Sequence, residues 1–191
     1  MIRVALNLVF SLLLSACASV PESNQVEIAQ DRYITLPAPS EFEGRASVNQ
    51  LITAKWDDST QTLPVYLEIT PSEIVLVGFS SWGTRVLTLH YDGEMLEADN
   101  LAGIGAVLPD GRQVLMNLML TLWPLEAWEP HLAKIGWQLK DNGLARTLLN
   151  ENGETVATIQ YDEPVVSGVI PDHIQFEQRQ QNYQITIQTL E

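Results

Sequence analysis

The chain has 191 residues, with 10 Lys and Arg against 24 Asp and Glu, so its formal net charge is −14. Phosphate backbones bind clustered Lys and Arg, and this acidic balance therefore argues against a nucleic-acid partner. A single cysteine excludes an intramolecular disulfide and a thiolate metal cluster. With 46% hydrophobic residues, the chain is apolar enough to form a globular domain, which excludes general disorder.

The first 16 residues predict a secretory signal peptide. Arg3 precedes an apolar stretch that ends at Leu14, and this stretch is too short for a membrane span of about 20 residues. The segment closes with Leu14-Ser15-Ala16-Cys17, which resembles the bacterial lipobox. In lipoproteins with that motif the cysteine is acylated and becomes the new N-terminus. The resemblance thus implies a covalent lipid on Cys17 and no other cofactor; the alternative is a free cysteine behind an ordinary signal.

The residue after the cysteine bears on the destination. Ala18 stands where inner-membrane lipoproteins of the enterobacterial type carry Asp, so the resemblance implies the outer membrane, with the domain on its periplasmic face. We expect residues 17–32 to be the lipidated cysteine and a flexible polar tether, and residues 33–191 to be one domain. The expected product is a monomer held at the outer membrane through Cys17.

From Tyr33 onward, apolar residues recur mostly with a period of two, which is typical of strands with one buried and one wet face. Tight turns such as Asp92-Gly93 and Asn152-Gly153 make neighbouring strands antiparallel. The predicted strands are Val65–Thr70, Ile74–Phe79, Thr84–Tyr91, Met95–Ala98, Trp137–Lys140, Leu144–Leu149 and Thr155–Tyr161, followed by a last hairpin whose apolar face carries Ile174, Phe176, Tyr183, Ile185 and Ile187.

One segment lacks this alternation. Gln113–Trp123 is rich in Leu and Met, has Asp110 before it as an N-cap and stops at Pro124, so it predicts a helix. A second helical turn over 125–132 would follow. A helix that is apolar nearly all round must be covered on nearly every side. We therefore expect a β-rich α+β fold: a curved antiparallel sheet, or half β-barrel, with one or two apolar helices filling its concave face. A plain α+β core without a cavity is the alternative.

Three stretches carry a resemblance to a known family: 77–85 (Val-Gly-Phe-Ser-Ser-Trp-Gly-Thr-Arg), 89–93 (Leu-His-Tyr-Asp-Gly) and 115–124. Together with the order of elements, they resemble the Lol lipoprotein-carrier superfamily (LolA/LolB type), above all its outer-membrane acceptor lipoproteins, over residues 33–191. More narrowly, the chain resembles an uncharacterised outer-membrane lipoprotein family often encoded beside aryl-polyene biosynthesis genes. The superfamily resemblance implies an incomplete barrel whose apolar hollow, closed by helices, receives acyl chains.

The same resemblance implies candidate residues for lipid binding or membrane contact. In the acceptor lipoproteins a turn between two early strands projects a leucine into solvent, and Trp82 stands at that place here, close to Phe79. An indole ring favours the head-group level of a bilayer, although Trp82 could instead fold over the sheet edge as core. The lining of the hollow would come from Leu87 and Leu89 of the sheet and from Leu115, Leu118, Met119, Leu122 and Trp123 of the helix.

Catalytic motifs are weak. His90, His131 and His173 lie far apart in the sequence and in no metal-ligand spacing. In the segment 78–83 the second glycine comes one position too late for a Gly-x-Ser-x-Gly elbow. We therefore expect no metal site and no enzyme, but a protein that binds or transfers a lipid or acylated cargo. The alternatives are a structural or assembly lipoprotein that binds a protein partner at the outer membrane and, with least support, a hydrolase.

Overall fold

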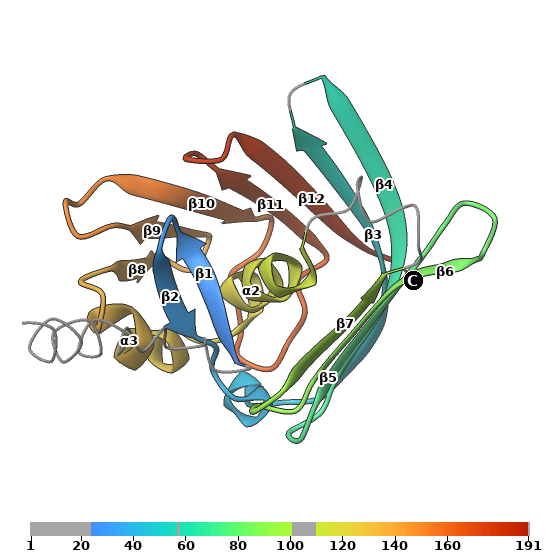
Figure 1. The fold of residues 1–191 in the computed structure, drawn as a ribbon, viewed down its shortest axis with the longest axis horizontal. Coiled ribbons are helices and arrows are strands. Elements are labelled where there is room, and N and C mark those ends of the chain that lie inside the picture. Colours follow the sequence, from blue (N-terminus) through green and yellow to red (C-terminus); the bar gives the residue numbers. More distant parts are fainter. Residues whose placement is uncertain (1–23, 57, 101–109, 191) are drawn as a thin grey trace, which may run out of the picture.

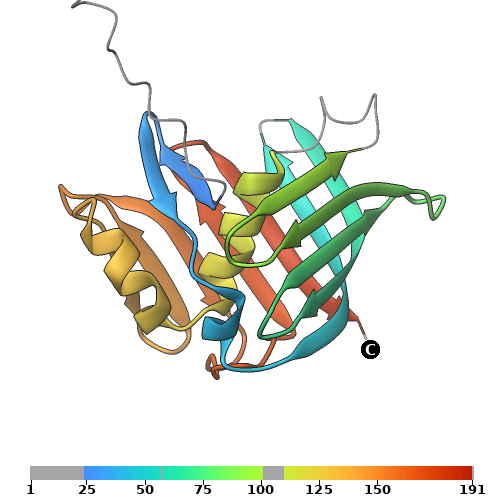
Figure 2. The ribbon, with the colours of Figure 1, turned by 60° about the horizontal axis from the view of Figure 1, so that its bottom comes forward.

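The computed structural model describes residues 24–56, 58–100 and 110–190. Ten strands form one sheet in the order β7-β6-β5-β4-β3-β12-β11-β10-β9-β8, and every neighbouring pair is antiparallel. The sheet curls into an open half-barrel around helix α2 (Figures 1 and 2). The predicted fold class is therefore confirmed.

Two meanders make up this sheet. The first contains β3 (Ala46–Trp56), β4 (Ser59–Ile69), β5 (Ile74–Phe79), β6 (Arg85–Tyr91) and β7 (Leu96–Asn100). The second contains β8 (Gln138–Asp141), β9 (Ala145–Leu149), β10 (Thr155–Tyr161), β11 (His173–Gln178) and β12 (Tyr183–Leu190). Pairing of β12 with β3, from Tyr183 opposite Trp56 to Leu190 opposite Asn49, joins the two meanders into one surface.

Helix α2 (Gly111–Leu122) fills the concave side, as its apolar sequence predicts. The Asp110 side chain caps it by accepting a hydrogen bond from the Arg112 backbone N–H at 2.8 Å. At Gly111 a Cβ atom would lie 2.5 Å from the Leu89 side chain and 2.8 Å from Ala98, so glycine lets the helix begin directly on the sheet. Helix α3 (Leu125–Ala133) follows after Pro124 and contacts β8.

The carbonyl end of α2 is buried and needs donors from outside the helix. Arg146 of β9 donates through Nη1 to the Leu120 and Trp123 carbonyl oxygens, at 3.0 and 2.7 Å. The Tyr161 hydroxyl donates to the Thr121 carbonyl oxygen at 2.8 Å. Arg146 also pairs with Asp141 through Nε at 2.7 Å, which compensates the charge of a guanidinium that is almost fully buried. These contacts fix one end of the helix to the sheet.

The curved sheet and α2 enclose a trough, and aromatic side chains close one end of it. The 3-10 helix η2 (Pro39–Phe42) places Phe42 against Trp123, with ring centroids 5.2 Å apart. The Trp123 indole N–H donates to the Ala38 carbonyl oxygen at 2.9 Å. The buried Tyr91 hydroxyl reaches the Leu36 and Gly93 carbonyl oxygens from the sheet, and burial raises its pKa well above the usual range.

The expected tether over residues 17–32 is wrong for its C-terminal part. Strands β1 (Gln25–Ala29) and β2 (Arg32–Thr35) form an antiparallel hairpin that packs against α2 and α3. Val26, Ile28 and Ile34 are buried in the core. The folded domain therefore begins about nine residues earlier than expected. The sequence does not predict this hairpin, because a strand that buries only two side chains gives too short a pattern.

None of the helices among the described residues has the length and apolar character needed to cross a membrane.

Replacing Arg146 with Met tests the attachment of α2. The variant leaves two buried carbonyl groups without donors, so we expect the free energy of unfolding to fall by roughly 3 kcal/mol in urea denaturation. Arg179→Met is the matched control, because Arg179 is exposed and its 3.6 Å pair with Glu177 contributes less than about 1 kcal/mol. Equal losses in the two variants would contradict the account.

Candidate functional site

Helix α2 presents two different flanks to its surroundings. Because the helix turns once every 3.6 residues, Leu115, Met119 and Leu122 lie on the side away from Asn117, and Leu118 lies at the border between the two sides. Leu115, Met119 and Leu122 are at most 1% exposed within the core. The other flank borders open space and consists of Gln113, Val114, Asn117, Leu118 and Thr121.

This open space is a cavity of about 540 Å³ between α2 and the concave face of the sheet. Its sheet wall is built in rows, because residues paired across strands point to the same side. Ile52 lies between Leu63 and Ile187, and Ala54 lies between Gln61 and Ile185. The remaining lining residues are Trp56, Val65, Leu76, Leu87, Asp110, Phe176, Gln181 and Tyr183.

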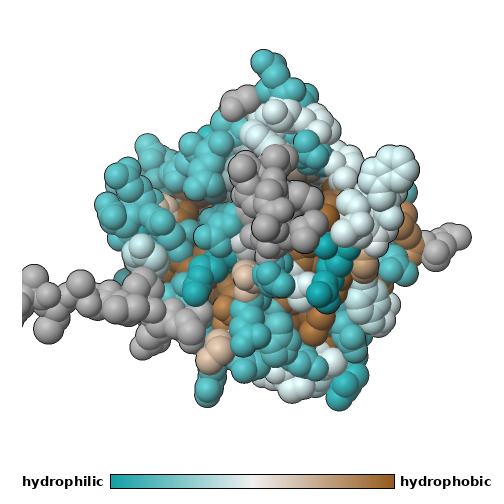
Figure 3. Space-filling view, turned by 45° about the vertical axis from the view of Figure 1, so that its right-hand side comes forward, coloured by the Kyte–Doolittle hydropathy of each residue, from teal (hydrophilic) through white to brown (hydrophobic). Residues whose placement is uncertain are grey.

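The cavity runs from the core to the surface. Val65, Leu76 and Leu87 are buried at its inner end, whereas Trp56 and Tyr183 are half-buried and Gln61 is exposed. On the face shown in Figure 3, hydrophobic residues are visible in gaps between hydrophilic ones. An apolar chain could therefore enter from solvent and pass between the sheet and the helix.

Gly78 has no side chain, and this leaves room at the inner wall of the cavity. It lies between Val65 and Leu87 in one cross-strand row, and a Cβ atom there would lie 2.6 Å from Leu63 Cδ2. Without that Cβ, the Leu63 side chain lies over the β5 backbone.

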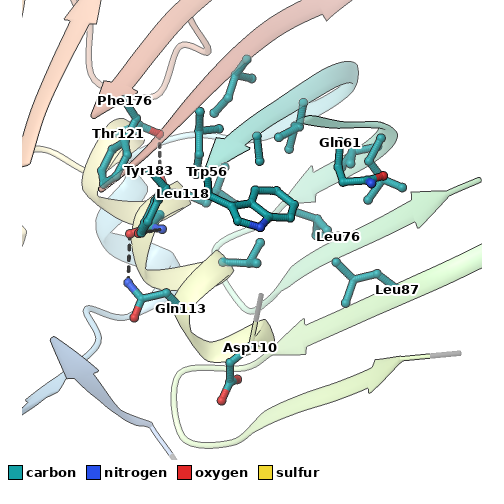
Figure 4. Close-up of a pocket in the computed structure, with 18 of the residues that line it drawn as sticks. Trp56, Gln61, Leu76, Leu87, Asp110, Gln113, Leu118, Thr121, Phe176 and Tyr183 are labelled. Atoms are coloured by element: carbon teal, nitrogen blue, oxygen red, sulfur yellow. Dashed lines mark hydrogen bonds between the residues drawn. The ribbon is translucent and has the colours of Figure 1, made fainter. Parts of the chain in front are cut away.

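Polar groups gather on the helix side of the cavity (Figure 4). The Asn117 amide donates to the Tyr183 hydroxyl oxygen at 2.7 Å, and the Gln113 amide donates to Asn117 Oδ1 at 3.2 Å. Burial raises the pKa of Tyr183, so its hydroxyl is protonated at neutral pH. The ring stacks on Phe176 with centroids 6.1 Å apart, which fixes the position of the hydroxyl.

The structure separates the candidate residues into several groups. Leu87 and Leu118 line the cavity. Leu89, Leu115, Met119 and Trp123 are at most 1% exposed and belong to the packed core instead. Leu122 borders a second space of about 270 Å³ beside Arg146, and Phe79 is half-buried outside both linings.

Sequence reasoning missed the β3 side of the wall. The period-two spacing of Ile52, Ala54 and Trp56 is the signal that could have predicted the inward face of β3. The inward Gln50, which is fully buried, interrupts the apolar pattern and hides it. The sequence predicts an apolar face that carries Tyr183, Ile185 and Ile187, but the pairing of this face with β3 is a long-range contact that no local pattern predicts.

Trp82 lies at the tip of the β5–β6 turn and is 92% exposed, so it is not core. The Ser80 hydroxyl oxygen accepts hydrogen bonds from the backbone N–H groups of Trp82 and Thr84, which shapes the turn. Figure 1 shows this hairpin projecting from the body of the domain.

Cys17 lies outside the described residues, so its lipidation stays a prediction. The described chain begins beside the β6–β7 turn, where the Asn24 amide donates to the Gly93 carbonyl oxygen at 3.2 Å. Trp82 precedes β6 and Gly93 follows it, so the length of that strand, about 23 Å for seven residues, separates the two features.

Among the described residues, Ser80 and His90, which the hydrolase alternative would use, contact other groups. Ser80 serves the turn backbone, whereas His90 Nε2 lies 2.8 Å from Glu73 Oε2. His173 lies 3.5 Å from Asp162, on another part of the sheet. Within the described ranges, no group of three His, Cys, Asp or Glu side chains could hold a metal ion.

Comparison with known proteins identifies the family through residues 47–191, which match the model of a protein of unknown function, DUF3261. The chain belongs to the DUF3261 family. No protein of curated function matches it. The match spans β3 to the end of β12, and thus contains every described residue of the cavity wall.

Solved structures that match include a domain from Vibrio parahaemolyticus described as an outer membrane lipoprotein-sorting protein. It is 8% identical, the alignment covers 78% of this chain and 84% of that one, and the TM-score is 0.40. At that level of similarity the match carries no function over to this DUF3261 chain. Neither match bears on aryl-polyene synthesis, so that association stays a prediction.

Proposed function

We propose that this DUF3261 protein is a non-catalytic lipoprotein that binds or transfers a lipid or acylated cargo in the cavity beside α2. The observation that carries the proposal is the cavity itself, about 540 Å³ of mostly apolar space that reaches from the core to the surface. Pockets for small molecules commonly measure about 300 to 1,000 Å³, so the space suits one acyl chain or a similar apolar group.

The energetics favour a long apolar ligand. Each methylene group removed from water contributes about 0.8 kcal/mol, so a chain of ten or more carbons binds even after its ordering cost. The wall that such a chain would contact is aliphatic and aromatic over four neighbouring strands, from Leu76 of β5 to Ile185 of β12.

An acylated Cys17 at the outer membrane, with the domain on the periplasmic side, completes the proposal. Asn24 lies seven positions after Cys17, and seven fully extended residues span at most about 25 Å. This short connection would hold the domain close to the lipid surface. The anchor is needed for this, because the anionic surface of the protein is repelled by anionic head groups. Cleavage before Cys17 and its acylation would both change the intact mass of the mature chain.

Blocking the cavity tests cargo binding. Ala54 is half-buried on the inner face of β3, so Ala54→Phe places a ring in the open space without removing a core contact. We expect the lipid that co-purifies with the membrane-extracted protein to fall at least about tenfold, because a fully buried Phe side chain competes with the ligand for the same apolar wall. The ratio of lipid to protein is measured by extraction and mass spectrometry.

Thr60→Phe is the control for this experiment, since Thr60 is exposed on the adjacent strand and is absent from the lining. It should retain the lipid of the unmodified protein. If both variants and the unmodified protein carry no lipid, the cavity binds no cargo, and the structural or assembly lipoprotein becomes the better account.

Trp82 is the proposed contact with a membrane or with arriving cargo. Trp82→Glu should leave the free energy of unfolding within about 0.5 kcal/mol, because the side chain is 92% exposed. It should slow the passage of bound lipid to acceptor vesicles, since a carboxylate is disfavoured where an indole inserts. Met95→Glu, a half-exposed apolar position in the β6–β7 turn, is the control. Equal transfer rates for the two variants would show that Trp82 makes no specific contact during lipid transfer.

A further inference from the structure

We propose that the cavity selects a chain whose adjoining polar group is uncharged and hydrogen-bonding, such as an ester or an amide, and rejects a free carboxylate or phosphate. This inference rests on the proposed function and names its ligand class. It starts from the composition of the wall: among the described lining residues there is no Lys, Arg or His.

An anion in this space would lack a partner. The carboxylate in the lining, Asp110, lies at the exposed rim and caps α2 by accepting from the Arg112 backbone N–H. The Arg112 guanidinium reaches away to the Gln25 carbonyl oxygen at 3.1 Å, and Lys55 is exposed on the outward face of β3. Burying a carboxylate or phosphate without a cation costs several kcal/mol, so a charged head group would have to stay in solvent beside Asp110.

The polar groups that the cavity does contain are neutral and are held in place. Asn117 is 5% exposed, and its amide donates to the Tyr183 hydroxyl oxygen at 2.7 Å. A tyrosine hydroxyl both accepts and donates, so accepting from Asn117 leaves its own proton for an acceptor. The Gln113 side chain makes a second hydrogen bond to this hydroxyl, and it lowers the pKa of Tyr183 as a donor to the oxygen does, so neither amide takes the proton. The Thr121 hydroxyl, in contrast, already donates to the Leu118 carbonyl oxygen.

The geometry thus assigns Tyr183 as the group that donates to a ligand carbonyl oxygen. It lies at the half-buried end of the cavity, where Figure 4 shows its ring between Phe176 and the polar side of α2. A chain seated along the aliphatic wall would bring its first carbonyl group to this end. Tyr183 is a specificity-determining residue in this account, and Asn117 is its positioning residue.

Two ligands with the same chain test the inference: decanoate, which is anionic, and 1-decanoylglycerol, which is a neutral ester. Affinities for the lipid-stripped full-length protein are measured by calorimetry at pH 8, below the micelle concentration of each ligand. We expect 1-decanoylglycerol to bind at least about tenfold more tightly, because only the charged ligand must keep its head group in water.

Tyr183→Phe separates the hydrogen bond from the charge effect, and it keeps the ring that stacks on Phe176. We expect this variant to bind 1-decanoylglycerol about fivefold more weakly and decanoate with unchanged affinity, as one hydrogen bond is lost. Its melting temperature verifies that it folds. Equal binding of both ligands by the unmodified protein, or an unchanged preference in Tyr183→Phe, overturns the inference while the proposed function stands. If neither ligand binds, the proposed function fails and the inference falls with it.

Discussion

The attachment of helix α2 to the sheet is the constraint on which the rest of the structure depends. Most residues of the helix are buried, so it must be covered, and its buried carbonyl end must receive hydrogen bonds. Arg146 and Tyr161 supply them from β9 and β10, and the Trp128 indole N–H adds one to the Met119 carbonyl oxygen at 3.2 Å. The helix therefore keeps one position within the curved sheet.

A helix fixed in this way divides the trough into a packed half and a hollow half. The β1–β2 hairpin, η2 and Trp123 fill the first half, and Phe42 and Tyr91 close it. In the second half the sheet faces α2 across open space, because the strands there carry residues such as Ala54 and Gly78 that do not reach the helix. The same anchoring that stabilises the fold thus leaves one flank of the helix available to a ligand.

Local sequence patterns predict most of the fold and little of the site. Period-two runs locate the strands from β4 to β12, and the Leu- and Met-rich run after Asp110 locates α2, because these signals arise from neighbouring residues. The flank of α2 that meets the cavity depends on which strands lie opposite it, so Leu118 and Leu115 look alike in sequence but are placed differently. The pairing of Trp56 with Tyr183 joins distant segments, and β1 is too short to be recognised.

The most direct test of the account is electron density from crystals of the protein extracted from its native membrane, without a lipid-stripping step. The account predicts continuous, chain-shaped density along the wall formed by Ile52, Leu63 and Ile185, ending beside the Tyr183 hydroxyl. A cavity closed by the protein's own side chains, with α2 packed directly against β3 and β4, would contradict it.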